Sequence, residues 1–432
     1  MMDSDSRPVL GTPEEIAASA APVLSPWRRI LLDEAYGGRW VVAGDVDGDG
    51  EVEIVSAQNY NENDVHHTTT AVAQKLDGTV LWRWGDPAAG RKTLHHDVAC
   101  QIYDWDGDGR NEVIVAADGA LVHLDGATGE ERRRIPIPRG ASDCVAFARL
   151  SGGGRADVLV KTRYTDVWAY TYAGDLLWHV SMPGGFKTAH QAQPIDIDGD
   201  GRDEVMAGVA LLNPDGSVRW VFETRAADPQ RGHLDAMRVV RAGERPEDWR
   251  LALTLCGAND LAMVDGAGRT VWEVPGRHFE SIDVGRFCPD VPGVQIAVDI
   301  DHVPWAQSPV WVFDEAGRQV GEMTTVYSRS HCLVPWGGGE VQHLAIGRPH
   351  GLFDCAGRRL ATFDLSLPEG VVAADVDPAD GAHVAVGDMT GDGTPDLLFS
   401  TGRAAYIFRN PGPATGAAGT AALGTGKNYT YY

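Results

Sequence analysis

The chain is built from short runs in which apolar and polar residues alternate, with Asp-rich and Gly-rich turns between them. Typical runs are Val80-Leu-Trp-Arg-Trp84 and Val218-Arg-Trp-Val-Phe222. Alternation of this kind is the pattern of half-buried β-strands, and no helical period competes with it. The order that recurs is strand, Asp-rich turn, strand, loop, strand, Gly turn, strand. The chain is therefore expected to be all-β, with four strands in each repeating unit.

One acidic phrase marks the first turn of four of these units. It reads Asp45-Val-Asp47-Gly-Asp49-Gly in the first copy, and the four copies occupy residues 45–53, 104–112, 196–204 and 388–396. Units without the full carboxylate set keep the same rhythm at about 142–183, 233–275, 278–324 and 330–365. Eight four-stranded units of roughly 35–50 residues predict a β-propeller of eight blades, or of seven if a terminal unit is shared.

The two ends of the chain bear on how the propeller closes. The last unit ends after Ala405-Tyr-Ile-Phe408 with one strand too few. The run Trp27-Arg-Arg-Ile-Leu-Leu32 is predicted to supply that strand and close the ring. The 432 residues would by length alone suggest two or three domains, but repeats share one continuous core. The predicted organisation is an N-terminal extension (1–26), a single propeller domain (27–410) and a C-terminal tail (411–432).

The composition argues against some classes of partner. Lys and Arg number 37 and Asp and Glu 61, so the formal net charge is 37 − 61 = −24. A chain this acidic is poorly suited to the phosphates of nucleic acids or to an anionic membrane. No apolar run approaches the roughly 20 residues that span a bilayer, and no secretory signal is recognised, so we expect a cytoplasmic protein. The six cysteines lack the spacing of a disulfide framework. The sequence does not indicate whether the protein is a monomer or an oligomer.

The acidic turns predict calcium sites. Asp at positions 1, 3 and 5, Gly at 6 and a carboxylate at 9 resemble the first half of an EF-hand loop, in which alternate oxygens reach one hard cation. The alternative is that Asp-Gly pairs simply make good turns. Because the turns recur around the ring, the ions are expected to be structural. The expected ligands are Asp45, Asp47, Asp49, Glu53, Asp104, Asp106, Asp108, Glu112, Asp196, Asp198, Asp200, Glu204, Asp388, Asp392 and Asp396.

Histidines are predicted to gather on the face opposite the acidic turns, which we call the mouth. In a propeller blade the first strand starts, and the second strand ends, on the same face. A single histidine at such a position is more often structural, but many of them on one face predict a functional cleft. The histidines at these positions are His67, His96, His190, His233, His278 and His331, with His302 and His350 in equivalent places.

The mouth is also predicted to be locally positive. The third unit places Lys161, Arg163 and Tyr164 there, and Lys187 lies just before the next strand. This set suits an anionic ligand, while the alternative for Arg163 is a salt bridge between blades. Elimination at a uronic acid needs these groups, because its carboxylate must be neutralised while a base removes the neighbouring proton. Hydrolysis ranks lower, since a glycosidase needs paired carboxylates and the mouth offers few.

A second metal is suggested by histidines and cysteines that share this face. Imidazole and thiolate are zinc ligands. The alternative for Cys256 is a small buried hydrophobic residue. Zinc is therefore considered beside calcium, and a metal-dependent hydrolase or isomerase becomes a third, weaker hypothesis. The residues concerned are His233, Cys256, His278, His302, His331 and Cys332.

Several phrases together resemble the β-propeller polysaccharide lyases, namely rhamnogalacturonan lyases and, in the His-rich mouth, ulvan and rhamnose–glucuronate lyases. The similarity runs from about residue 35 to the end. Its most diagnostic element is Lys-x-Arg-Tyr at 161–164. The other phrases are the acidic turns, Trp168-Ala-Tyr170, Gly-His-x-Asp at 232–235, Arg277-His278-x-Glu280-Ser, and the terminal Gly-Thr-Gly-Lys-Asn-Tyr-Thr-Tyr-Tyr.

The resemblance implies a lyase that cleaves a glycosidic bond at a uronic acid, often next to rhamnose, in an acidic polysaccharide or oligosaccharide. It implies a centre of His67, His96, Arg163 and Tyr164, in which Tyr164 transfers the proton while His96 and Arg163 neutralise the carboxylate. The competing hypothesis is a non-catalytic propeller that binds carbohydrate or protein and calcium. The residues expected to bind substrate are Lys161, Lys187, His190, His233, His278 and His331.

Overall fold

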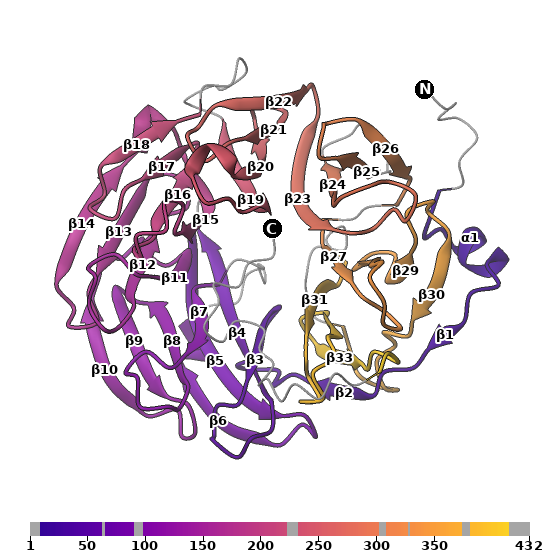
Figure 1. Ribbon diagram of the computed structural model, residues 1–432. Coiled ribbons are helices and arrows are strands. Elements are labelled where there is room, and N and C mark those ends of the chain that lie inside the picture. Colours follow the sequence, from indigo (N-terminus) through magenta and orange to yellow (C-terminus); the bar gives the residue numbers. More distant parts are fainter. Residues whose placement is uncertain are drawn as a thin grey trace.

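A computed structural model describes residues 9–62, 65–89, 98–222, 232–301, 308–326, 329–373 and 381–413. Within them the strands form eight antiparallel sheets arranged in a ring, which confirms the eight-bladed propeller (Figure 1). Each blade has at least four strands, which run outward from the central axis in sequence order except that N-terminal strands take the outermost place in blades 7 and 8, and alternating residues pack against the blades on either side. No helix among the described residues has the length and apolarity that crossing a membrane requires.

The first four blades follow the chain without interruption. Blades 1 and 2 contain β3 (Trp40–Gly44), β4 (Glu53–Glu62), β5 (Val65–Lys75), β6 (Val80–Gly85), β7 (Cys100–Tyr103), β8 (Glu112–Ala117), β9 (Ala120–Asp125) and β10 (Glu131–Pro136). Blades 3 and 4 contain β11 (Cys144–Ala148), β12 (Asp157–Lys161), β13 (Asp166–Tyr170), β14 (Leu176–Ser181), β15 (Thr188–Ile195), β16 (Glu204–Gly208), β17 (Ala210–Leu212) and β18 (Val218–Val221).

The remaining four blades complete the ring. Blades 5 and 6 contain β19 (His233–Arg241), β20 (Arg250–Cys256), β21 (Asp260–Val264), β22 (Thr270–Pro275), β23 (His278–Gly285), β24 (Gln295–Asp301), β25 (Val310–Asp314) and β26 (Gln319–Met323). Blades 7 and 8 contain β27 (His331–Val334), β28 (His343–Ile346), β29 (Gly351–Phe353), β30 (Arg359–Phe363), β31 (His383–Gly387), β32 (Asp396–Ser400), β33 (Ala404–Phe408) and, from the N-terminus, β2 (Arg28–Leu31).

The N-terminal segment closes the ring as predicted. β2 pairs antiparallel with β33, with Arg28 opposite Ile407. Before it, β1 (Val23–Leu24) adds a fifth, parallel strand to blade 7, and Leu10 bridges to Thr325 after blade 6. A short helix, α1 (Pro13–Ala18), lies between them, and the indigo segment in Figure 1 passes outside blades 7 and 8. Three 3₁₀ turns, η2 (Pro87–Ala89), η3 (Pro183–Gly185) and η4 (Pro246–Asp248), complete the secondary structure of the described residues.

A repeated tryptophan contact joins neighbouring blades. In four blades a Trp of the outermost strand donates its indole N–H to a backbone carbonyl in the last turn of the next blade. Each of these turns also holds a glycine with positive φ directly against the indole ring, where a side chain would clash. The four bonds run from Trp82 to Gly126 (2.7 Å), Trp178 to Pro214 (3.0 Å), Trp220 to Gly266 (3.0 Å) and Trp272 to Glu315 (3.0 Å).

One disulfide corrects the interpretation of the cysteines. Cys288, after β23 of blade 6, is bonded to Cys355, in the last turn of blade 7, and their Cα atoms lie 5.2 Å apart. The two residues are 67 positions apart, and only the packing of one blade on the next brings them together. Spacing along the chain therefore carried no signal of the bond.

Candidate active site

The mouth residues stand at one end of the blades. His233, His278 and His331 are the first residues of β19, β23 and β27, and His190 is the third residue of β15. Antiparallel pairing places the acidic turns at the other end of the same strands. His96 and His302 lie outside the described residues, so the structure says nothing of their predicted places.

A buried charge network forms the base of the mouth between blades 1 and 3. Asp143, just before β11, lies 2.9 Å from His66 Nδ1, 3.4 Å from Lys161 Nζ and 3.7 Å from Arg163 Nη1. All four side chains are buried. Burial alone would raise the pKa of Asp143, but Arg163, Lys161 and His66 outweigh it and hold that pKa well below its usual range. The carboxylate therefore stays ionised and fixes the three basic groups around it.

Lys161 is positioned as a support for its neighbours. Its ammonium also donates to the carbonyl oxygens of Thr162 (2.6 Å) and Arg163 (2.7 Å), and its side chain is 1% exposed. Burial lowers the pKa of Lys161, although the nearby Asp143 carboxylate opposes that shift. Lys161 was expected to bind substrate, and the structure instead shows it holding the backbone that presents Arg163 and Tyr164.

Tyr164 is the point at which the basic residues and the histidines meet. The Arg163 guanidinium lies 5.1 Å from the centre of the Tyr164 ring and the Lys187 ammonium 4.9 Å from it. The ring centres of His233 and His190 lie 4.5 and 5.7 Å from that of Tyr164. Tyr164 and Lys187 are partly exposed, whereas both histidines are buried. The structure thus brings five predicted mouth residues, from three consecutive blades, into one cluster.

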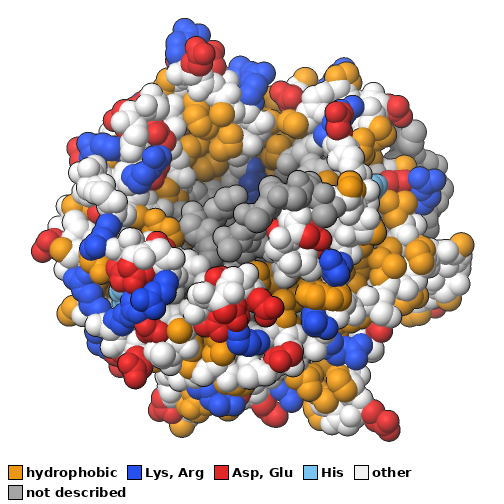
Figure 2. Space-filling model, turned by 60° about the horizontal axis from the view of Figure 1, so that its bottom comes forward, with side chains coloured by type: hydrophobic (Ala, Val, Ile, Leu, Met, Phe, Trp, Pro, Cys, Tyr) orange, Lys and Arg blue, Asp and Glu red, His pale blue; other side chains and the backbone are white. Residues whose placement is uncertain are grey.

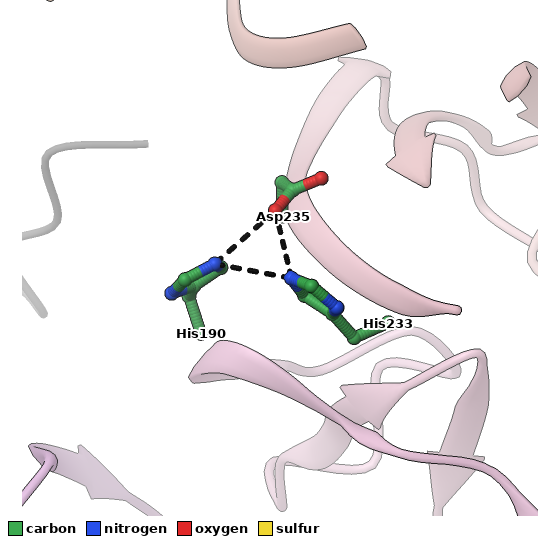
Figure 3. A group of neighbouring side chains, drawn as sticks. All are labelled: His190, His233 and Asp235. Carbon is green, nitrogen blue, oxygen red and sulfur yellow. Dashed lines mark hydrogen bonds and ion pairs between the residues drawn. The ribbon is translucent and has the colours of Figure 1, made fainter. Parts of the chain in front are cut away.

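His190, His233 and Asp235 form a tight triangle beside Tyr164 (Figure 3). The Nε2 atoms of the two histidines lie 3.2 Å apart, and each is 3.2 Å from Asp235 Oδ1. Burial, and then the negative charge of Glu280, raises the pKa of Asp235 to about 7. Tetrahedral zinc with bonds of about 2.0–2.1 Å separates its ligand atoms by about 3.3 Å, so this donor set fits zinc.

A second group of donors continues from Asp235 into blades 5 and 6. Cys256 Sγ lies 3.9 Å from His278 Nδ1, and ligand atoms of both residues lie within 4.8 Å of an Asp235 oxygen. The other nitrogen of His278 lies 2.8 Å from Glu280 Oε1, which also accepts from Arg329 at 3.2 Å. The predicted zinc ligands His233, Cys256 and His278 are therefore close together, joined by Asp235.

The remaining predicted residues lie apart from Tyr164. The His331 ring is fully buried, with Nδ1 2.5 Å from Asp283 and Nε2 3.4 Å from Asp299, so it binds blade 6 to blade 7. His67 stacks on Tyr60, with ring centres 5.0 Å apart, and faces a groove between blades 1 and 2. Its neighbour His66 takes the inner position beside Arg163, with Nδ1 3.4 Å from Nη1.

A basic side chain pairs with carboxylates of each acidic turn. In the second turn one oxygen of each carboxylate accepts a backbone N–H, while the other oxygens of Asp106, Asp108 and Glu112 lie 3.4–4.0 Å from Arg132 Nη1. The inward oxygens therefore converge on one positive charge, an arrangement that fits calcium when the arginine moves aside. In the other turns the shortest ion pair between described residues joins Lys75 to Asp49 (2.7 Å), Arg219 to Glu204 (2.6 Å) and Arg409 to Asp392 (3.5 Å).

Known proteins resemble the chain both in sequence and in fold. A model of the C-terminal domain of rhamnogalacturonan lyase family 11 matches residues 33–133. Rhamnogalacturonan exolyase YesX of Bacillus subtilis is 24% identical over 314 residues, which cover 57% of this chain and 51% of YesX. Rhamnogalacturonan endolyase YesW of the same species is 26% identical over 312 residues, which cover 54% of this chain and 50% of YesW. The resemblance to the β-propeller rhamnogalacturonan lyases is confirmed.

The chain spans about half the length of these two rhamnogalacturonan lyases. The crystal structure of YesW matches 89% of this chain and 76% of its own, with a TM-score of 0.64 and 19% identity. The Vibrio cholerae biofilm matrix protein Bap1 matches 90% of this chain and 91% of its own, with a TM-score of 0.60 and 11% identity. The fold is thus shared beyond the rhamnogalacturonan lyases, and the activity must be argued from the site.

Two residues of the site, His66 and Asp143, were not predicted from the sequence. His66 was passed over for His67, although strand alternation allows only one of two neighbours to face inward. Asp143 stands in blade 3 just before the first strand, close to the place of His233 in blade 5. That shared position was the one signal that marked it as a mouth residue.

Proposed function

We propose that the protein is a polysaccharide lyase that cleaves a glycosidic bond at a uronic acid, linked to rhamnose, by β-elimination. The observation that carries the proposal is the position of Tyr164 between two cations and two imidazoles. A uronate carboxylate is attracted to the Arg163 and Lys187 charges, and this neutralisation makes the proton on the adjacent carbon acidic. The resemblance to rhamnogalacturonan lyases supports the same class of substrate.

In the proposed reaction Tyr164, as the phenolate, accepts the proton from the carbon next to the carboxylate. The electron pair of that C–H bond forms the new double bond, and the bond to the 4-linked oxygen breaks. The leaving oxygen takes a proton from a general acid. His67 and His96 stay predictions in this scheme, since His67 faces the neighbouring groove and His96 lies outside the described residues.

A hydrolytic alternative finds less support in these side chains. A glycosidase needs two carboxyl groups that face the scissile bond, one of them able to donate a proton. Asp143 is held ionised among three basic groups, and Glu280 accepts from His278 and Arg329, which hold its pKa well below the usual range despite burial. Both carboxylates are therefore committed to pairing with the protein's own cations.

Calcium and zinc are proposed as the bound metals. Calcium is assigned to the acidic turns, where it would hold the carboxylate oxygens of each turn together. Zinc is assigned to His190, His233 and Asp235, with Cys256 or His278 as a further donor, where it would supply positive charge beside the substrate carboxylate. The protein is expected to contain zinc after purification without chelators, as measured by atomic emission. His190→Ala should lose that zinc, while His179→Ala, at an exposed histidine paired with Asp166, should retain it.

The decisive test of the lyase is the ultraviolet absorbance of an unsaturated uronate, followed with rhamnogalacturonan and ulvan in the presence of calcium. The absorbance should rise with the native protein and not with Tyr164→Phe. Tyr172→Phe is the matched control, because Tyr172 lies in the last turn of the same blade, stacked under Arg155 at the acidic end. A rise that survives Tyr164→Phe would remove Tyr164 from the proton transfer. No rise on either polymer, with binding retained, would favour the non-catalytic propeller.

A further inference from the structure

A groove separate from the Tyr164 cluster opens between blades 1 and 2. It has a volume of about 670 Å³ and is lined by the ends of β4, β6 and β8, the start of β5 and part of β10. Its wall carries two aromatic side chains, Tyr60 and Trp84, and three arginines, Arg83, Arg134 and Arg139. On the face shown in Figure 2 basic and acidic side chains are interspersed. The three arginines make the lining of this groove rich in positive charge, although the whole chain has a net charge of −24.

The groove is held in shape by contacts among its own side chains. Glu131 Oε1 accepts from Trp84 Nε1 at 2.8 Å and from Arg134 Nη2 at 2.9 Å. Tyr60 and His67 stack with their ring planes at 27°. Trp84 and Tyr60 are half-buried, so each fixes one part of its ring and leaves another part accessible. Such prearranged aromatic surfaces reduce the ordering cost when a flat, ring-shaped ligand binds.

Arg139 supplies the charge for an anionic ligand. It is exposed and makes no ion pair with any described residue, whereas Arg83 pairs with Asp33 and Arg134 with Glu131. Burial, and then the positive charge of Arg139, lowers the pKa of His67, so at neutral pH its imidazole is uncharged and can donate and accept hydrogen bonds. One guanidinium, one neutral imidazole and two aromatic faces match a sugar ring that carries a carboxylate.

The groove adjoins the proposed reaction centre. His66 and His67 are neighbours on β5 and point to opposite sides of the strand. His66 contacts Arg163, which lies over Tyr164, while His67 lines the groove. A sugar chain bound at Tyr164 and continuing across β5 would therefore place a further residue among Trp84, His67 and Arg139.

We propose that this groove is a separate binding subsite for an acidic saccharide, in which Arg139 pairs with a uronate carboxylate and Trp84 and Tyr60 pack against sugar rings. The inference rests on the proposed function for the identity of its ligand, because it assigns the groove to a further sugar residue of the same polymer. It differs from the proposed centre in its residues and makes a distinct prediction: the groove matters for long chains and not for short ones.

The test is calorimetric binding of rhamnogalacturonan disaccharides and long oligosaccharides, each also in a form whose carboxyl groups have been reduced to alcohols. Tyr164→Phe is the background if the native protein cleaves them. Arg139→Ala and Trp84→Ala should each weaken binding of the long oligosaccharide about tenfold and leave the disaccharide unchanged. Arg139→Ala should have no effect on the carboxyl-reduced form, while Trp84→Ala should still weaken it. Arg155→Ala, at an arginine that lies over Tyr172 at the acidic end of blade 3, is the matched control.

The outcomes separate this inference from the lyase proposal. Unchanged affinity for the long oligosaccharide in Arg139→Ala and Trp84→Ala, or no binding of it by the native protein, would overturn the subsite even if elimination is observed. Equal losses for the disaccharide and the long oligosaccharide would also overturn it, since the groove would then be part of the centre. A selective loss without any elimination would support the subsite and remove the lyase.

Discussion

The buried imidazole of His331 makes the stability of the propeller depend on pH. Its ring is fully enclosed between Asp283 of blade 6 and Asp299, with Nδ1 2.5 Å and Nε2 3.4 Å from their oxygens. Burial alone would lower the pKa of His331, but the two carboxylates outweigh it and raise that pKa to about 9. Asp299 itself has a raised pKa because of burial, so Asp283 is the stronger partner.

The magnitude follows from the difference between the folded and unfolded states. An unfolded histidine loses its proton near pH 6.5, about 2.5 units below the folded value, and each unit corresponds to about 1.4 kcal/mol. Between these two values the folded protein binds the extra proton, so the free energy of unfolding falls as the pH rises. The contribution of up to about 3.5 kcal/mol is complete below pH 6.5 and lost above pH 9.

The assay is urea unfolding, followed by tryptophan fluorescence, at several pH values between 6 and 10. His331→Gln should be less stable than the native protein at pH 6, and this difference should shrink by about 3.5 kcal/mol as the pH passes 9. His343→Gln is the matched control, because His343 lies in the same blade and burial lowers its pKa, so it is uncharged throughout the upper range. A difference between native protein and His331→Gln that stays constant with pH would refute the reasoning.

Two further changes test the blades themselves. Asp143→Asn should lower the free energy of unfolding by about 3–5 kcal/mol, because Lys161 is left buried without its anion. Lowering the pH to 4 should not reproduce this loss, since the pKa of Asp143 lies well below its usual range. Gly268→Ala should lower the free energy of unfolding by about 2 kcal/mol more than Gly276→Ala. Both glycines have positive φ, but only at Gly268 would the new Cβ meet a ring, that of Trp220 at 2.7 Å. Equal losses of unfolding free energy in the two alanine variants would contradict the account of the glycine contact. A native protein that loses about 3–5 kcal/mol at about pH 4 through protonation of Asp143 would contradict the account of the charge network.

The fold was largely predictable because its signals are local. Strand alternation and turn residues are read within a few positions, and their repetition along the chain gave the number of blades. Even the closing strand could be foreseen, since the last unit was one strand short and an unused apolar run preceded the first. The disulfide between Cys288 and Cys355 could not, because it joins two blades and follows from their packing alone.

The site was predictable only as a set of residues at one end of the blades. Which of two neighbours faces inward depends on the register of a long hairpin, so His66 rather than His67 reaches Arg163. Likewise, His331 was placed at the correct end of its strand, but Asp283 and Asp299 enclose its ring. These differences arise from side-chain packing around the axis, which no local pattern records.

The sequence by itself determined the all-β repeat, the ring of eight blades, the closure by the N-terminal strand and the separation of acidic turns from basic and histidine-bearing ends. The strands and turns behind these properties are set by residues close together in the chain, and the closure follows because the last unit is one strand short. Only the tertiary structure decided that His190, His233 and Asp235 meet at 3.2 Å, that Tyr164 lies between two cations, and that a groove opens beside His67. Each of these combines side chains from different blades, and their distances are set by the packing of whole sheets.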